Sequence, residues 1–182
     1  TQNFLVSAQA TTPYGVTFNN DGTKMYITDV NIRDLFEYAL STPYDISTAS
    51  YTDKLDIAQD NTPTDVRFNN DGTKLFMVGA NSDEINEYDL SVAYDVSTGV
   101  YQGVRDISGE ETSPSDLVFS RDGHVLLTVG LADDAVDQYY LPTAFDTAQM
   151  LYVDTFSVVS EDISPNSIEL SADGTKMYIL GG

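Results

Sequence analysis

Short runs of apolar residues, separated by polar turns, repeat along this chain about every fifty residues. The first run of each unit mostly alternates apolar with polar residues: 15–18, 65–68, 116–119 and 167–170. The second run is apolar on consecutive residues: 24–28, 75–78, 125–128 and 177–180. Alternation predicts a strand with one buried face, and an unbroken apolar run of this length predicts a strand buried on both faces.

An Asp-Gly pair joins the first run to the second in every unit, with spacings of 50, 51 and 51 residues. The pairs are Asp21-Gly22, Asp71-Gly72, Asp122-Gly123 and Asp173-Gly174. Asp-Gly between apolar runs predicts a tight hairpin turn, because glycine accepts the positive φ that such a turn needs. Four hairpins at one period indicate a repeat architecture.

Two further strand-like runs complete each full unit. The third runs are 35–40, 85–90 and 136–141, and the fourth runs are 51–57, 101–107 and 152–158. An aromatic residue followed by Asp lies in the loop between them, as at Tyr44-Asp45, Tyr94-Asp95 and Phe145-Asp146. No segment longer than a turn shows the helical period. Four antiparallel strands per period of about fifty residues predict an all-β fold built of β-propeller blades.

The repeats are interpreted as one propeller domain, residues 1–182, with about four blades. Three complete blades are expected at about 12–61, 62–112 and 113–163, and a partial blade from 164–182 together with 1–11. Residues 2–7 are interpreted as a fourth strand, because Phe4 and Phe156 each precede a proline by nine residues. The partial blade then lacks its third strand.

An incomplete blade leaves strand edges with unpaired backbone groups, and such edges invite pairing with another chain. Three alternatives stay open: the sequence is a segment of a longer propeller, a partner chain completes the blade, or four blades close with one incomplete. A protein partner or self-assembly through the open edges is therefore expected.

Charge narrows the range of partners. The 182 residues carry 29 acidic and 8 basic side chains, which gives a net charge of −21. A surface this negative repels phosphate backbones, so nucleic-acid binding is not expected. No apolar run approaches the length of about 18 residues that spans a membrane, so membrane insertion is not expected. The absence of cysteine leaves no disulfide framework and no thiolate metal site.

The turn and the strand after it resemble a known repeat. Residues 21–27 and 173–179, both Asp-Gly-Thr-Lys-Met-Tyr-Ile, resemble the core of the YVTN-type and TolB-like propeller repeats. Residues 87–98 are similar to fifty-residue propeller repeats of bacterial surface or secreted proteins and of phage structural proteins. The resemblance implies a β-propeller over essentially the whole chain. For function it implies a scaffold, an adhesive or tail-associated module, or in some members a hydrolase.

Residues for nucleophilic catalysis are scarce. His124 is the only histidine, and it falls in a surface turn where the other repeats have threonine. The sequence contains no Gly-x-Ser-x-Gly motif and no second histidine for a catalytic triad. Hydrolysis by Ser–His–Asp is therefore not expected.

Acidic residues gather in the loops that would share one face of a propeller. Hard cations such as Ca²⁺ take about six to eight oxygen ligands, and the best candidates to supply them are Asp83, Glu84, Asp133 and Asp134. The alternative is a solvated acidic rim that keeps the protein soluble. No cofactor is expected other than this Ca²⁺.

Tyrosines recur at two positions of the repeat: Tyr38, Tyr88 and Tyr139, and Tyr51, Tyr101 and Tyr152. Exposed rings at these positions would stack on sugars, whereas buried rings would form the core between blades, which is the commoner use of a repeated aromatic position.

These observations favour a non-enzymatic structural or binding module of an extracellular, cell-surface or virion assembly, with rigid blades for protein or glycan contact. The alternative is a Ca²⁺-dependent hydrolase of the lactonase-like propeller type. Such an enzyme needs residues that occur in one repeat only and converge on the central channel, and the sequence shows few of them. A channel with neither a metal nor a carboxylate cluster would rule the hydrolase out.

Overall fold

The computed structural model describes residues 3–182, which form four antiparallel sheets. The first sheet holds β1 (Pro13–Phe18), β2 (Lys24–Asp29), β3 (Asp34–Leu40) and β4 (Ala49–Asp56). The second holds β5 (Pro63–Phe68), β6 (Lys74–Gly79), β7 (Glu84–Leu90) and β8 (Gly99–Asp106). The third holds β9 (Pro114–Phe119), β10 (Val125–Gly130), β11 (Ala135–Tyr140) and β12 (Leu151–Ser157). The fourth has only β13 (Pro165–Leu170) and β14 (Met177–Gly181).

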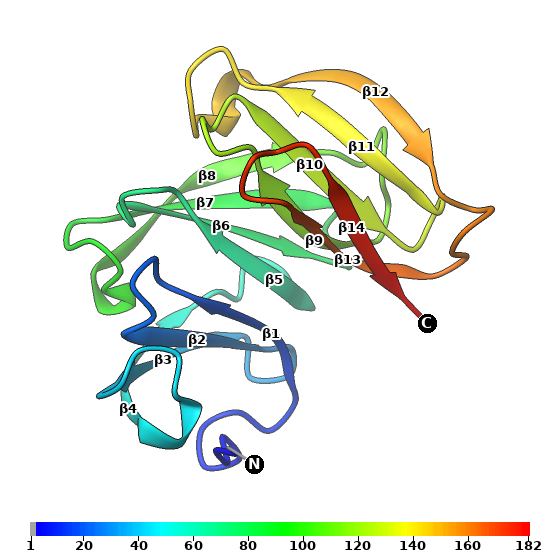
Figure 1. Ribbon diagram of the computed structural model, residues 1–182. Helices are drawn as coiled ribbons and strands as arrows, with labels where there is room; N and C mark the ends of the chain where they lie inside the picture. The colour runs from blue at the N-terminus through cyan, green and yellow to red at the C-terminus, as the bar shows by residue number, and fades with distance from the viewer. Residues whose placement is uncertain (1–2) are drawn as a thin grey trace.

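Each sheet is a blade whose strands follow one another in chain order, with its first strand on the inner side, where the blades meet (Figure 1). The innermost strands are β1, β5, β9 and β13, and each packs on the next in that series. The three complete sheets are named blades 1, 2 and 3 below, and β13–β14 is named the half-blade. This arrangement is that of a β-propeller, so the predicted all-β fold is confirmed.

The Asp-Gly pairs form the turn between the first and second strand of each blade. Their four glycines have φ between 69° and 75°, a left-handed conformation that glycine adopts without a steric penalty. In the first turn the Asp21 carboxylate accepts hydrogen bonds from the backbone N–H and the hydroxyl of Thr23, at 2.9 and 2.6 Å. A Cβ on Gly22 would collide with the ring of Tyr44, so the turn and the aromatic-Asp loop lie against each other.

Each aromatic-Asp loop ends in a single 3₁₀ turn: η1 (Ile46–Thr48), η2 (Val96–Thr98) and η3 (Thr147–Gln149). The preceding aspartate caps the turn, as where Asp45 accepts a hydrogen bond from the Ser47 N–H at 3.0 Å. Asp95 and Asp146 cap η2 and η3 in the same way. Within residues 3–182 no helix is long and apolar enough to cross a membrane.

The apolar core lies between successive blades. Tyr26 of β2 is buried among residues of blade 2, and Phe76 of β6 is buried among residues of blade 3. The second strands therefore bury both faces, as their unbroken apolar runs predict.

The two sets of repeated tyrosines have different environments. Tyr38, Tyr88 and Tyr139 on the third strands are at most 2% exposed and belong to the core. Tyr51, Tyr101 and Tyr152 on the fourth strands are 40–44% exposed, and each packs edge-on against the buried tyrosine of its own blade. Only the second set is open to a ligand.

The N-terminal segment differs from the expected strand. Residues 3–6 form no strand, and Gln2, where the expected strand begins, lies outside the described residues. The segment packs on blade 1, where the rings of Phe4 and Tyr38 meet edge-on with centroids 5.4 Å apart. The prediction that residues 1–11 join 164–182 in one sheet is corrected, because a fourth strand pairs through a third strand and none is present there.

The segment nevertheless keeps the predicted place in the repeat. The carbonyl of Val6 accepts hydrogen bonds from the N–H groups three and four residues later, at 2.9 and 2.8 Å. The carbonyls of Ile107 and Val158, the residues directly after the fourth strands of blades 2 and 3, make the same pair of bonds. Val6 therefore corresponds to the residue directly after a fourth strand.

One buried carboxylate ties together two loops of each blade. In blade 2, Asp60 accepts hydrogen bonds from the backbone N–H groups of Thr62 and Ser82, so it joins the loop before β5 to the loop after β6. Glu111 takes this place in blade 3, where it accepts from the N–H groups of Ser113 and Ala132.

In blade 1 the carboxylate that joins the two loops comes from the other loop. Its carboxylate is Asp29 at the end of β2, which accepts from the N–H groups of Thr12 and Ile32. The loop position that holds Asp60 in blade 2 holds the buried Ala10 in blade 1. The strand end that holds Asp29 in blade 1 holds Gly79 in blade 2, where a Cβ would collide with the Asp60 carboxyl. Only one of the two positions has room for a carboxylate.

This exchange is testable in blade 2. We expect Asp60→Ala to lower the free energy of unfolding by about 2–4 kcal/mol, because buried N–H groups of two loops lose their acceptor. Gly79→Asp alone should also destabilise, since two carboxylates then occupy one space. The double variant recreates the blade 1 arrangement and should recover most of the loss, which a double-mutant cycle from urea unfolding measures. Simple addition of the two losses would contradict the exchange.

Candidate functional site in the central channel

The four innermost strands line a cleft of about 300 Å³ in the central channel. Most of the residues that line it have polar side chains, and they come from the three blades and the half-blade. The polar side chains used below are Thr64, Asp65, Arg67, Ser115, Asp116 and Ser167.

Arg67 on β5 is the cation of this cleft. Its Nε donates to the carbonyl oxygen of Leu117 at 2.9 Å and lies 3.3 Å from Asp65 Oδ2. Its Nη2 donates to Asp116 Oδ1 at 3.1 Å and lies 3.8 Å from Glu169 Oε2. Nη1 makes no hydrogen bond to another of the described residues. Three carboxylates from three strands thus surround one guanidinium.

The two aspartates of the cleft are held differently. Asp116 is fixed by hydrogen bonds from the Ser167 hydroxyl at 2.6 Å and from the Ile168 N–H at 2.9 Å, both to Oδ2. Asp65 is buried, and its Oδ2 accepts no hydrogen bond from residues 3–182. Burial raises the pKa of Asp65 well above its usual range, although the charge of Arg67 opposes that rise. Burial therefore makes Asp65 a more basic carboxylate than an exposed aspartate.

These charges occupy repeat positions that differ from blade to blade. Aligned on the Asp-Gly turns, one position of the first strand reads Gly15, Asp65, Asp116 and Ser167. Two residues later the strands read Thr17, Arg67, Val118 and Glu169. The position between them is always apolar.

The sequence analysis did not predict this set. It looked for residues unique to one repeat in the loops, which are similar in all repeats, and not in the first strands. A position-by-position comparison of the four first strands could have found it. Three carboxylates therefore lie around one guanidinium in the channel, and they do not form a group that could hold a metal ion.

The calcium candidates lie away from this cleft, in the turns between second and third strands. Asp83 and Asp134 both have positive φ, 56° and 52°, and their carbonyls accept the backbone N–H groups that follow the fourth strands. Glu84 begins β7, and Asp133 lies beside Glu111. Among residues 3–182 no group of three or more His, Cys, Asp or Glu side chains could hold a metal ion.

The acidic end of blade 3 contains two carboxyls with shifted pKa values. Burial raises the pKa of Glu111 to about 7. The hydrogen bond from the Ser113 N–H lowers this pKa, and the nearby Asp133 raises it. Burial also raises the pKa of Asp137 on β11 to about 6. Both groups hold a proton in the folded protein at pH values where the unfolded chain has lost it.

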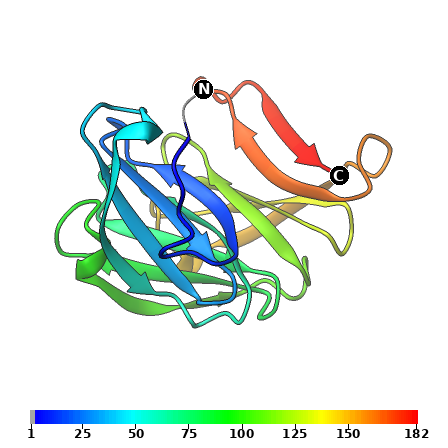
Figure 2. The same cartoon turned by 90° about the horizontal axis from the view of Figure 1, so that it is seen from below.

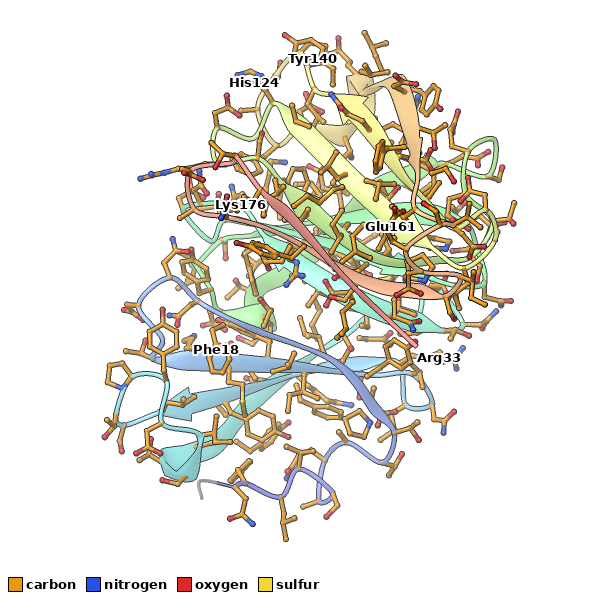
Figure 3. The ribbon with its side chains drawn as sticks, turned by 45° about the vertical axis from the view of Figure 1, so that its right-hand side comes forward. Phe18, Arg33, His124, Tyr140, Glu161 and Lys176 are labelled. Carbon is orange, nitrogen blue, oxygen red and sulfur yellow. The ribbon has the colours of Figure 1, made fainter. Side chains whose placement is uncertain are left out.

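His124 lies at the other end of the strands, as do the lysines that recur at the start of the second strands, Lys24, Lys74 and Lys176. Figure 3 shows His124 and Lys176 at that end, and Arg33 and Glu161 at the opposite end. The His124 ring stacks on Tyr140, and its Nδ1 lies 2.8 Å from the carbonyl oxygen of Leu141. His124 thus has a local contact with the neighbouring strand and does not line the channel cleft.

Comparison with protein families finds no matching family model, and comparison with curated proteins finds no relative. Solved structures do match. A candidate 6-phosphogluconolactonase from Bacteroides fragilis gives a TM-score of 0.69 at 14% identity, over 92% of this chain and 47% of its own. The periplasmic gluconolactonase PpgL of Pseudomonas aeruginosa gives 0.62 at 16%, over 92% and 46%. The β-propeller domain of Cps50 (Swd1) from Myceliophteria thermophila gives 0.62 at 13%, over 93% and 50%.

At these identities the likeness shows the fold alone, which is the β-propeller. The chain spans about half the length of each of these three structures.

The raised pKa values predict how stability depends on pH. Between the ordinary value of 4.5 for Glu111 and its folded value of about 7, the folded state binds more protons than the unfolded state. The free energy of unfolding should therefore fall as pH rises through this range. We expect Glu111→Gln to flatten the fall, because its amide oxygen still accepts the loop N–H groups. Thermal melts from pH 4.5 to 7.5 measure this.

The control is Asp53→Asn, which removes one charge from an exposed position on β4. A pH profile of Asp53→Asn that is as flat as that of Glu111→Gln would show that general charge repulsion, and not Glu111, causes the fall.

Proposed function

We propose that the central-channel cleft binds and hydrolyses small lactones of sugar acids. The observation that carries the proposal is the guanidinium of Arg67 among Asp65, Asp116 and Glu169, inside a cleft large enough for a small molecule. A concave site with a few convergent polar groups and a carboxyl of perturbed pKa is the usual setting for small-molecule chemistry.

The groups of the cleft suit lactone hydrolysis. Asp65, as the basic carboxylate, takes a proton from a water molecule while the water oxygen bonds to the lactone carbonyl carbon. Arg67 stabilises the negative charge that develops on the carbonyl oxygen. It does so through Nη1, the guanidinium nitrogen that donates no hydrogen bond to the described residues. Collapse of this intermediate breaks the ring C–O bond, and the proton on Asp65 passes to the leaving alkoxide. The product is a hydroxy acid.

The comparisons add support of a different kind. Two of the similar structures carry gluconolactonase names, which favours the hydrolase alternative over the non-enzymatic module that the sequence favoured. The chain spans about half of the length of those structures. Its cleft is formed by the inner strands of four sheets.

Calcium has no step in this reaction. The predicted ligands Asp83, Glu84, Asp133 and Asp134 do not form a set that could hold a metal ion within the described residues, and a guanidinium lies among the cleft carboxylates. The calcium requirement stays a prediction, and assays with added Ca²⁺ and with a chelator test it.

The proposal predicts loss of activity in two variants. With glucono-1,5-lactone as substrate, we expect Arg67→Gln and Asp65→Asn each to lower kcat/KM by about 10²-fold, because each removes a group that acts in the transition state. Initial rates are measured by pH-stat after subtraction of the spontaneous hydrolysis. Circular dichroism melts of each variant show whether the fold is retained.

The matched control is Arg121→Gln, which removes an exposed arginine from an Asp-Gly turn and should leave kcat/KM unchanged. Hydrolysis by the parent chain no faster than the spontaneous rate would refute the proposal. Folded Arg67→Gln and Asp65→Asn variants with parental activity would refute the assigned roles.

A second candidate function is the non-enzymatic binding module expected from the sequence. It is favoured by the large apolar side chains that the half-blade exposes, including Tyr178 and Leu180, because contiguous exposed apolar surface marks interaction sites. Protein binding without lactone hydrolysis would support this candidate alone.

A further inference from the structure

We propose that the central-channel cleft accepts uncharged lactones and excludes lactones that carry a separate anionic group, and that Glu169 on β13 strengthens this selection. The inference rests on the proposed lactone hydrolysis and names the charge class of its substrate. It follows from the charges that surround Arg67, from the single nitrogen that its guanidinium has free, and from the direction of the hydrogen bonds that the cleft hydroxyl groups make.

The charged groups around Arg67 are negative in sum. Its guanidinium lies 3.3 Å from Asp65 Oδ2, 3.1 Å from Asp116 Oδ1 and 3.8 Å from Glu169 Oε2. Burial raises the pKa of Asp65, but a proton on Asp65 still leaves two carboxylates against one cation. Among the described residues that line the cleft, Arg67 is the only lysine or arginine. An anionic group on a ligand therefore meets no cation that is free of carboxylates.

Arg67 has only one nitrogen to offer a ligand. Nε donates to the carbonyl oxygen of Leu117 at 2.9 Å, and Nη2 donates to Asp116 Oδ1 and Oδ2 at 3.1 and 3.3 Å. Nη1 is the nitrogen that serves the lactone carbonyl oxygen in the proposed reaction. Arginine commonly holds a carboxylate or a phosphate through two parallel N–H groups. A ligand could use such a pair here only by displacing Asp116 or Leu117, so a second anionic group finds no partner.

The hydroxyl groups of the cleft are acceptors toward a ligand. Thr64 Oγ1 donates its hydrogen to the carbonyl oxygen of Val78 at 3.2 Å, and Ser115 Oγ donates to that of Val129 at 3.1 Å. The Ser167 hydroxyl donates to a carboxylate of the cleft at 2.6 Å. A hydroxyl group has one hydrogen and two lone pairs, so these three groups can only accept from a ligand. The hydroxyl groups of a sugar acid lactone supply matching hydrogens, whereas an ionised carboxylate has none.

The donors that remain in the cleft are uncharged. They are the hydroxyl of Tyr14 and the amide of Asn166, which donates one of its two hydrogens to the carbonyl oxygen of Ser164 at 3.0 Å. Both groups suit the ring and hydroxyl oxygens of a lactone whether or not the lactone also carries a charge. They therefore do not compensate the repulsion of an anionic group by the carboxylates.

Glu169 is the carboxylate whose charge is least compensated. It lies farther from the guanidinium than Asp65 and Asp116 do, and its side chain is 62% exposed. Its strand, β13, is drawn in orange in Figure 2, next to β14 in red. Aligned on the Asp-Gly turns, no other first strand has an acidic residue at this position. An exposed charge beside the cleft acts on a ligand as it enters, and dissolved salt screens it.

The test compares two lactones that share one ring, D-glucono-1,4-lactone and D-glucaro-1,4-lactone. The first has a hydroxymethyl group at the position where the second has a carboxylate. Initial rates are measured by pH-stat near neutral pH, after subtraction of the spontaneous hydrolysis. We expect kcat/KM to favour the uncharged lactone by about 30-fold in about 0.02 M salt, and by less than about threefold in about 1 M salt, because salt screens the repulsion.

The variant Glu169→Gln tests the assigned residue. We expect it to lower the ratio of the two kcat/KM values by about fivefold at low salt, mainly through a lower KM for the anionic lactone, because the lost charge acts on binding. The control is Asp53→Asn, which also removes one exposed carboxylate, but on β4, and should keep the ratio of the parent. An equal change of the ratio in both variants would overturn the role of Glu169.

Equal kcat/KM values for the two lactones at low salt, or a preference that salt does not alter, would overturn the charge selection. Hydrolysis of neither lactone above the spontaneous rate would refute the proposed reaction alone, and the same two lactones then serve as ligands in calorimetry. Tighter binding of D-glucono-1,4-lactone would uphold the charge selection without the reaction. Equal binding of both lactones, or binding of neither, would overturn it.

Discussion

The packing of each blade on the next is the interaction on which the rest of this structure depends. A four-stranded sheet of this repeat has two apolar faces, and in blades 1 and 2 the face that carries Tyr26 or Phe76 is buried by the following blade. The same repeat position in the half-blade is Tyr178, which is 55% exposed, and no other blade among residues 3–182 packs on it. Stability in such an array is approximately a sum over units and their neighbouring interfaces. The exposure of a side chain therefore depends as much on its place in the series as on its sequence.

This constraint also separates positions that must repeat from positions that are free to vary. The apolar residue between Asp65 and Arg67 is Val66, which packs between blades, and its counterpart in every other first strand is apolar as well. Asp65 and Arg67 themselves line the channel, and the residues at their two positions differ from one first strand to the next. Variation there leaves the apolar packing between blades in place, and chemistry gathers on positions that a scaffold leaves free.

The repeat period, the Asp-Gly turns and the doubly buried second strands were predictable from the sequence, because each follows from local turn chemistry or from periodicity. The absence of a strand at residues 3–6 was not predictable from the sequence. Phe4 keeps the register of Phe156, but the described residues offer no third strand with which this segment could pair. The channel cluster was partly predictable. The differing residues at the positions of Asp65 and Arg67 can be read from the repeats, but their convergence on one guanidinium depends on the curvature of the array.

The acidity of the chain is better explained by its loops than by a cationic partner. Asp29 accepts hydrogen bonds from the N–H groups of Thr12, Asn31 and Ile32, and Asp60 does so from two loops. A carboxylate offers about four acceptor sites and no donor, whereas an asparagine in the same place would direct an NH₂ group at these donors. The aspartates of the Asp-Gly turns and of the 3₁₀ turns also accept hydrogen bonds from backbone N–H groups, at the surface. Because each repeat adds several such acceptors and few bases, the net charge of −21 follows in large part from how the turns are built.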